Sequence, residues 1–356
     1  MGSNIYIFTN SYKPVLGGLQ TVTAQLAEGL KRQSKEVIVV TSMFKQTMRI
    51  YQHIKHVPVY RFPFGYKITL LFLYVLFFIK RPSAVYVHFP LDQAWFVLKL
   101  KKHFRFKLIT CFHGHDVLRY DEGYSKYDPI HKFQYNLVHA SDQVTACSRW
   151  LAKRVEKEFS YENVIVVYNC VDLSRFNIRM PSPYSGQYFF AFGRLEQIKG
   201  FDLLIQAFAG INNYNNLHLL IAGDGSQRES LERLIEKKGL EGRAVIIGRK
   251  TPEEIVAYSQ NALANIIPSL REPFGIIALE SIAARRPVVA TNSGGLPEVM
   301  DSRFGVIVEP SVESIRLGLQ KVLKGDFIYD GSVIESYLER FTIDEMVNNY
   351  SSLLAR

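Results

Sequence analysis

Short runs of β-branched and aromatic residues recur along the chain and alternate with longer segments whose apolar positions repeat every three to four residues. Runs of the first kind are typical of buried strands, and the longer repeat is typical of amphipathic helices. Strands that alternate with helices indicate βαβ units and a parallel sheet. We therefore predict strands over residues 4–9, 36–41, 84–89, 107–112, 143–147 and 164–168, with helices such as 19–33 and 148–159 between them.

The same alternation begins again after residues 176–187, FNIRMPSPYSGQ, whose prolines and small polar residues are typical of a linker. It predicts further strands over residues 187–193, 217–223, 243–248, 263–268, 287–291 and 305–308.

A chain of 356 residues is also too long for one compact core. We expect an α/β protein with two Rossmann-like, doubly wound domains, residues 1–178 and 186–340, facing each other across a cleft. The last helical segment, residues 341–356, is expected to pack back on the first domain. Ligands of doubly wound sheets bind beyond the carboxyl ends of the strands, so functional residues are expected there.

The net charge of +10 is unevenly distributed. Residues 1–180 contain 25 Lys or Arg and 12 Asp or Glu, whereas residues 181–356 contain 18 and 21. A basic half favours an anionic partner. Because no zinc-finger, RRM or basic-zipper pattern is present, we expect an anionic membrane surface or a phosphorylated lipid rather than nucleic acid. A solvated basic face without a partner is the alternative.

The most apolar run, residues 68–79, is flanked by Lys67 and by Lys80 and Arg81. At 12 residues it is shorter than the ~20 that span a bilayer, so it predicts a buried or interfacial helix. The N-terminus lacks the pattern of a signal peptide. Three scattered cysteines have no zinc-type spacing, and we expect buried, reduced thiols in a cytosolic protein: Cys111, Cys147 and Cys170.

Two carboxylates flank the start of a predicted helix. Glu272 lies in the loop after the strand that ends at Pro268, and Glu280 lies inside the helix. The first helical turn has N–H groups without intrahelical partners, which favour an anion or a hydroxyl group. Acids beside such a site suit a polyhydroxy ligand that also carries phosphate. The alternative is a helix-dipole acid followed by a solvated helix residue. The candidate N–H groups belong to Phe274, Gly275, Ile276 and Ile277.

Two cations follow the first strand of the second predicted domain. Arg194 and Lys199 lie five residues apart in a loop, before Gly200 and an amphipathic helix. A guanidinium and an ammonium at one strand end can converge on a diphosphate. A surface loop with scattered charge is the alternative.

Two strand ends of the first domain carry further candidates. Gly17 and Gly18 precede a helix, so backbone can approach a phosphate there, although the chain has no GxGxxG fingerprint. The strand over residues 107–112 ends directly in His113, which is followed by His115 and Asp116. His113 is a candidate substrate contact, with a core or supporting histidine and a metal ligand as alternatives.

Six stretches resemble, in order, the retaining glycosyltransferases of family four, which have the GT-B fold. The resemblance covers nearly the whole chain, and its specific part is a Glu-x7-Glu element combined with an Arg…Lys pair. Cys170 and Gln20 depart from residues that are common in the family, which leaves the fine specificity open. The stretches are GG at 17–18, HGHD at 113–116, VYNCVDLSRF at 167–176, GRLEQIKG at 193–200, AGDG at 222–225 and EPFGIIALE at 272–280.

The resemblance implies a nucleotide-diphosphate sugar bound mainly by the second domain. Glu280 would hold the ribose hydroxyls, while Arg194 and Lys199 would neutralise the diphosphate and stabilise the leaving nucleotide. Glu272 would contact the hydroxyls of the donor sugar, with the backbone amides of residues 274–277 alongside. Such sites need no divalent metal, and the anomeric configuration is retained.

The resemblance also assigns residues of the first domain and one near the base. Gly17 and Gly18 would approach the diphosphate, and His113 would touch the sugar near its anomeric carbon. Arg249, or its neighbour Lys250, would lie near the base.

We therefore expect a retaining, metal-independent hexosyltransferase without a cofactor. Its donor would be a UDP- or GDP-sugar, and its acceptor a lipid-linked or cell-surface glycan at the cytoplasmic face of a bacterial inner membrane. A sugar-nucleotide epimerase of the same fold is one alternative, although no additional acid/base set is evident. A non-catalytic partner protein that binds a sugar nucleotide is the other, and the intact acids and cations disfavour it.

Overall fold

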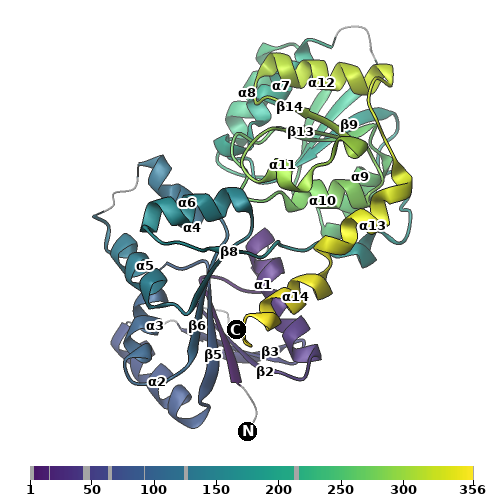
Figure 1. The fold of residues 1–356 in the computed structure, drawn as a ribbon. Coiled ribbons are helices and arrows are strands. Elements are labelled where there is room, and N and C mark those ends of the chain that lie inside the picture. The colour runs from purple at the N-terminus through teal and green to yellow at the C-terminus, as the bar shows by residue number, and fades with distance from the viewer. Residues whose placement is uncertain are drawn as a thin grey trace. The chain divides into compact units, whose positions relative to one another are not determined.

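A computed structural model describes residues 4–15, 17–42, 49–62, 66–91, 93–123, 127–211 and 216–355. The chain forms two compact units. Unit 1 comprises residues 1–170 together with 343–356, and unit 2 comprises residues 171–342. Each unit is an α/β domain with its own sheet (Figure 1).

The sheet of unit 1 has the strand order β3-β4-β2-β1-β5-β6-β7-β8. Its strands pair in parallel apart from the antiparallel hairpin β3–β4. The order changes direction at β1, which lies between β2 and β5 and therefore marks a place where ligands bind in such sheets. The strands are β1 (Asn4–Thr9), β2 (Glu36–Ser42), β3 (Tyr51–Ile54), β4 (Val57–Phe62), β5 (Pro82–His88), β6 (Lys107–Phe112), β7 (Gln143–Ala146) and β8 (Ile165–Val166).

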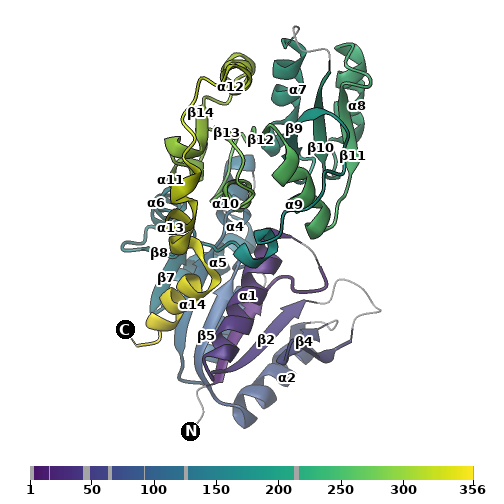
Figure 2. The same cartoon turned by 90° about the vertical axis from the view of Figure 1, so that its right-hand side faces the viewer.

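Helices cover both faces of this sheet. On one face, apolar side chains of α2, α3 and α5 form a core with Tyr6, Phe8 and Val85 of the strands. On the other face α1 lies beside α14 (Figure 2), where Tyr86 of β5 donates a hydrogen bond of 2.8 Å to the backbone oxygen of Tyr350. The helices are α1 (Gly18–Arg32), α2 (Tyr66–Ile79), α3 (Gln93–Lys101), α4 (His115–Leu118), α5 (Pro129–Ala140), α6 (Arg149–Phe159) and α14 (Ile343–Ser352), with the 3-10 turn η1 (Arg119–Glu122).

The sheet of unit 2 has the parallel order β11-β10-β9-β12-β13-β14, with its change of direction between β9 and β12. Apolar residues of α7, α8 and α12 cover one face, and Tyr258 of α9 packs on the other. The strands are β9 (Gln187–Phe192), β10 (Leu217–Ala222), β11 (Ala244–Gly248), β12 (Ala264–Ile267), β13 (Val288–Thr291) and β14 (Gly305–Val308).

The helices of unit 2 complete the alternation of strand and helix. They are α7 (Phe201–Ala209), α8 (Arg228–Lys237), α9 (Pro252–Asn261), α10 (Ile276–Ala283), α11 (Leu296–Val299), α12 (Val312–Lys324) and α13 (Ile334–Leu338). Shorter 3-10 turns are η2 (Leu173–Phe176), η3 (Gln197–Lys199), η4 (Ser302–Phe304), η5 (Gly331–Val333) and η6 (Glu339–Phe341).

The predicted strands and the fold class are confirmed, with two differences. The hairpin β3–β4 was not predicted, because β3 has only four residues, none of them buried, and β4 contains a proline and a buried arginine, Pro58 and Arg61. The boundary between the units falls after Cys170 rather than at residue 178. The segment that follows belongs to unit 2, since Val171 N–H donates to Phe341 O at 2.9 Å and Gln260 Nε2 donates to Ile178 O at 3.1 Å.

Candidate functional site

The change of strand order in unit 2 brings two predicted site loops together. The loop after β9 carries Arg194 and Lys199, and the loop after the neighbouring β12 carries Glu272. The N–H of Leu270 donates to Ile198 O at 2.9 Å, which joins the two loops directly. A Cβ at Gly200 would lie 2.2 Å from Pro268 O, so the loops approach closely only because residue 200 is a glycine.

Lys199 and Glu272 form an ion pair at this junction. The Lys199 Nζ lies 2.5 Å from Glu272 Oε2, and only 15% and 13% of the two side chains are exposed. Ser269 Oγ donates to the same carboxylate oxygen at 3.4 Å. Two candidate residues that lie 73 positions apart in the chain therefore meet in a largely desolvated setting. A charged pair held there is available to a ligand that carries both hydroxyls and phosphate.

A pair of glycines that the sequence analysis gave no role supports the Glu272 loop. Gly294 has a φ of +60°, and a Cβ there would lie 2.1 Å from Glu272 O. Gly295 donates its N–H to Glu272 O at 2.7 Å, and a Cβ on it would lie 2.5 Å from Pro273 O. The segment after β13 thus packs backbone to backbone against the loop that holds the carboxylate. The adjacent glycines at positions 294 and 295 were the feature of the sequence that could have indicated this close backbone packing.

Arg194 and Arg249 lie at the same end of the sheet with largely exposed side chains. Arg249 Nε is 3.4 Å from Asp224 Oδ2 and the Arg249 side chain is 82% exposed. The loop that carries Asp224 lies against the loop of Arg194, since Leu195 N–H donates to Asp224 O at 3.0 Å. Both cations therefore stand near the carboxyl ends of β9 and β11. Lys250 instead approaches Glu254, at 3.6 Å, and the ring of Tyr258, at 5.9 Å.

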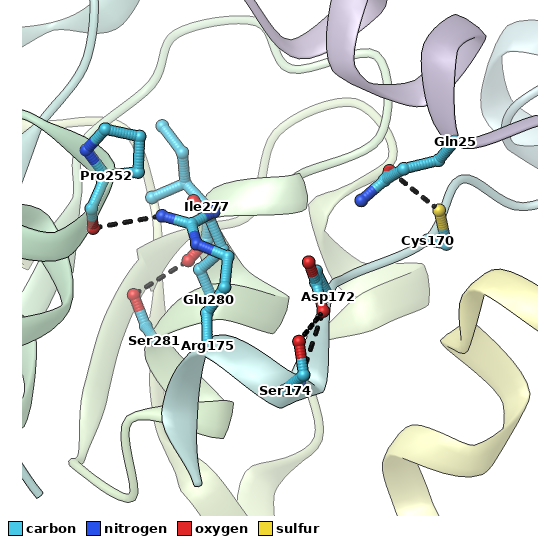
Figure 3. Close-up of polar contacts among 9 residues, drawn as sticks. All are labelled: Gln25, Cys170, Asp172, Ser174, Arg175, Pro252, Ile277, Glu280 and Ser281. Atoms are coloured by element: carbon cyan, nitrogen blue, oxygen red, sulfur yellow. Dashed lines mark hydrogen bonds and ion pairs between the residues drawn. The ribbon is translucent and has the colours of Figure 1, made fainter. Parts of the chain in front are cut away.

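Glu280 is mostly buried and is held by an arginine that the sequence analysis assigned no role. Arg175 of η2 places Nη1 at 3.3 Å from Glu280 Oε1, and its Nη2 donates to Pro252 O at 3.0 Å (Figure 3). The exposed fractions are 27% for Arg175 and 18% for Glu280. Burial raises the pKa of Glu280, and the neighbouring guanidinium acts to lower it. A solvated helix residue, the alternative considered for Glu280, does not describe this environment.

The helix that carries Glu280 includes only two of the four residues, 274–277, whose N–H groups were predicted to lie in its first turn. α10 starts at Ile276, after Gly275 in a left-handed conformation with φ of 110°. The N–H of Ala278 already donates to Gly275 O at 2.9 Å. By helix geometry the N–H groups of Ile276 and Ile277 have no intrahelical acceptor. Phe274 is buried, with its ring 6.1 Å from that of Phe341, so its side chain belongs to the core of unit 2.

In unit 1, His113 follows β6 directly and lies against a second, buried histidine. His113 Nε2 is 2.9 Å from Nδ1 of His88, and the rings stack at 5.0 Å between centroids. Burial lowers the pKa of His113 to about 4, although Asn169 beside it acts in the opposite direction. Burial and His113 also lower the pKa of His88 well below its usual value. Both imidazoles are therefore neutral at pH 7.

Asp116 shapes the turn at His113 rather than joining a cluster of ligands. Its carboxylate accepts the N–H groups of His113 and Gly114 at 2.9 and 2.7 Å. Burial raises the pKa of Asp116 to about 7, against the effect of these N–H groups. His115 is exposed. Within the described ranges, no group of three or more His, Cys, Asp and Glu gathers as metal ligands.

The remaining predictions in unit 1 concern the glycine pair and the cysteines. Gly17 and Gly18 are exposed at the start of α1, which begins at Gly18. The three cysteines are buried free thiols, and Cys170 Sγ lies 3.2 Å from Gln25 Oε1 (Figure 3). None of the helices in the described part of the chain reaches the length and apolarity that a bilayer crossing needs.

Two protein-family models together match most of the chain. The family model for Glycosyltransferase Family 4 matches residues 16–175, and that for Glycosyl transferases group 1 matches residues 179–335. The chain belongs to the family-four glycosyltransferases. Together the two matches span both units, so the loops after β9 and β12 and the turn at His113 lie within the matched residues.

Individual relatives cover nearly the whole chain. An uncharacterised glycosyltransferase of Methanocaldococcus jannaschii is 29% identical, over 97% of each chain. The N-acetyl-alpha-D-glucosaminyl L-malate synthase of Bacillus anthracis is 24% identical over 96% of this chain and 94% of its own. HepE of Anabaena, solved in complex with UDP-glucose, superposes with a TM-score of 0.77 at 20% identity, covering 99% of both chains. The structural similarity supports the GT-B fold, and the family models and relatives support a glycosyltransferase activity.

Proposed function

We propose that the protein is a retaining hexosyltransferase that uses a UDP- or GDP-sugar and modifies a lipid-linked or cell-surface glycan. The observation that carries this proposal is the ion pair Lys199–Glu272 at the change of strand order in unit 2, together with Glu280 on α10, the helix that follows the Glu272 loop. A metal-free nucleotide-sugar site needs cations for phosphate and carboxylates for hydroxyls, and these residues supply both. UDP-glucose in the structurally similar HepE supports the donor class.

In this proposal the chemistry depends on charge that develops on the leaving nucleotide. Cleavage of the glycosidic C–O bond leaves the electron pair on the diphosphate, where Lys199 and Arg194 stabilise the new negative charge. Once Lys199 binds the diphosphate in place of Glu272, the Glu272 carboxylate accepts hydrogen bonds from hydroxyl groups of the sugar. Glu280 accepts hydrogen bonds from the ribose hydroxyls. The acceptor hydroxyl attacks from the face that the diphosphate leaves, and its proton passes to the departing phosphate.

The carboxylates are therefore not the acid and nucleophile of a glycosidase. The N–H groups of Ile276 and Ile277 add two fixed donors, with those of Phe274 and Gly275 alongside. Arg175 is a positioning residue in this scheme. It opposes the effect of burial on the Glu280 carboxyl and fixes one of its oxygens, which leaves the other for a ribose hydroxyl. Arg249 contacts the base.

Unit 1 contributes backbone and a neutral imidazole. Gly17 and Gly18 approach the diphosphate, and His113 contacts the sugar near its anomeric carbon. Because the pKa of His113 is lowered to about 4, we propose a contact through a neutral ring rather than proton transfer. In this proposal the protein acts at the cytoplasmic face of a membrane. The excess of Lys and Arg over Asp and Glu in residues 1–180 supports this location.

A panel of nucleotide sugars tests this function. We expect UDP- or GDP-sugars, but not free sugars, to raise the melting temperature, because a ligand that binds only the native state stabilises it. NMR of the purified product reports whether the anomeric configuration is retained, and activity should be unchanged after treatment with EDTA. Incubation with donor alone distinguishes an epimerase, which would yield a new sugar nucleotide. Absence of any shift across the panel would contradict the proposal.

A further inference from the structure

Helix α2 of unit 1 is apolar on two opposite sides. On the inner side, Leu73, Leu76 and Phe77 join the core, and the Phe77 ring lies 4.6 Å from that of Tyr6. On the outer side, six large apolar side chains are open to solvent. They are Ile68 (59% exposed), Leu71 (67%), Phe72 (38%), Val75 (50%), Phe78 (70%) and Ile79 (70%), and we refer to them as the α2 face.

The spacing of these residues places them on one continuous stripe. Positions 68, 71, 72, 75, 78 and 79 follow the three-and-four repeat of a helix surface. A helix on the surface of a globular protein normally presents polar residues there, and contiguous apolar patches of this kind mark contact with another molecule or a membrane. The core on the inner side is already complete, so the stripe is not needed for folding.

Aromatic residues extend the stripe onto the edge of the sheet. Phe72 lies 5.3 Å from the ring of Phe62 and 5.8 Å from that of Tyr60, both on β4. Tyr60 in turn contacts Tyr51 of β3, at 4.7 Å, and Tyr51 is 45% exposed. Figure 2 shows α2 beside β4 at this edge of unit 1. Tyrosines at the border of an apolar surface are typical of proteins that sit at a membrane–water interface.

The sequence around α2 is strongly basic. Between residues 37 and 115 the sequence has twelve Lys or Arg and a single acid, Asp92. Lys67, Lys80 and Arg81 are exposed at the two ends of α2. The end of α3 lies next to α2, since Tyr74 donates to Lys99 O at 3.3 Å and its ring lies 5.3 Å from that of His103. It adds further exposed cations, among them Lys99. An apolar stripe bordered by cations complements an anionic lipid surface.

We propose that the α2 face inserts into the headgroup–acyl boundary of an anionic membrane, with α2 lying in the plane of the surface. At 14 residues the helix is too short to span a bilayer, whereas an interfacial helix needs only one apolar face. The inference rests on the peripheral location that we proposed above and names the residues responsible for it. It does not depend on sugar transfer, so the two can fail separately.

Flotation with vesicles tests the inference. The full chain should float with vesicles of phosphatidylcholine containing about 30% phosphatidylglycerol, and far less with phosphatidylcholine alone, since each basic residue near the surface contributes about 1 kcal/mol. The triple variant Leu71→Gln/Phe78→Gln/Ile79→Gln should bind at least about tenfold more weakly, because it removes the three most exposed side chains of the stripe. These side chains contribute little to the core, so the variant should fold.

The double variant Ile178→Gln/Ile328→Gln is the matched control. It removes two exposed apolar side chains of unit 2, 74% and 64% exposed, and should float like the wild type. Affinity for UDP, measured by calorimetry, should be unchanged in both variants, which separates this inference from the proposed function. Failure of the wild type to bind anionic vesicles, or equal binding by the triple variant, would overturn the inference. So would a wild-type dimer that the triple variant converts to a monomer without any vesicle binding, because the stripe would then cover a second copy of the chain.

Discussion

Replacement of Arg175 by alanine should weaken the binding of UDP by making Glu280 a poorer acceptor. At 3.3 Å the two charges interact by about 5 kcal/mol at an effective dielectric constant of about 20. Both side chains are partly exposed, at 27% and 18%, so solvent screening reduces the net contribution to about 1–2 kcal/mol. That energy corresponds to a loss of roughly tenfold in affinity.

The pH dependence has a characteristic sign. Burial already raises the pKa of Glu280, and without the Arg175 guanidinium it should rise further. Relative to the wild type, the affinity of the variant for UDP should therefore recover as pH increases and the carboxylate ionises. The free energy of unfolding of the variant should instead decrease as pH increases. A carboxyl group whose folded-state pKa is raised stabilises the folded protein at low pH, and this contribution is lost as pH increases through that pKa.

Calorimetric titration of UDP between pH 5 and pH 8 would measure the first effect, and urea denaturation over the same range the second. Arg179→Ala is the matched control, since Arg179 is an exposed arginine of the same connecting segment. The UDP affinity of Arg175→Lys should lie between those of Arg175→Ala and Arg179→Ala, because lysine keeps the charge but loses the second hydrogen bond, to Pro252 O. If Arg175→Ala binds UDP as tightly as the wild type, or more tightly, Arg175 competes for Glu280 and does not position it.

Three further outcomes follow from the geometry of the site. Lys199→Ala should lower kcat about 10²- to 10³-fold in a transfer assay, as the loss of one preorganised charge-stabilising group does elsewhere, and unchanged turnover would exclude its role on the leaving group. Gly294→Ala and Gly239→Ala share a left-handed φ, of 60° and 63°, but only the former places Cβ against Glu272 O, at 2.1 Å. In urea denaturation Gly239→Ala should cost about 1 kcal/mol and Gly294→Ala clearly more, with a loss of UDP affinity in Gly294→Ala alone. Since the folded-state pKa of His113 is about 4, the unfolded chain binds a proton that the native state does not, and the free energy of unfolding should fall as pH decreases from about 6.5 towards 4. His113→Asn should reduce that slope, and an unchanged slope would contradict the assigned pKa.

Local pattern was sufficient for most of the fold because strands and helices of a doubly wound sheet have distinct apolar periods. The hairpin β3–β4 was missed because β3 is a four-residue strand without a buried side chain, and β4 places Pro58 and the buried Arg61 among its apolar residues, although burial alternates along both strands. The linker predicted between the domains at residues 176–187 was misplaced, because these residues and the turn η2 both belong to unit 2. Their packing in unit 2 depends on Arg175 and on the amide of Gln260, both long-range contacts.

The sequence by itself determined which residue types stand at the strand ends, and hence that cations, carboxylates and glycines could meet a nucleotide sugar. Only the tertiary structure decided which of them meet. The pairing of Lys199 with Glu272 arises from the change of strand order between β9 and β12, and that of Glu280 with Arg175 from a turn 105 residues away in the chain. The tertiary structure also decided that the α2 face is exposed. A helix that is apolar on all sides can be fully or partly buried, and its sequence does not show which until its neighbours are known.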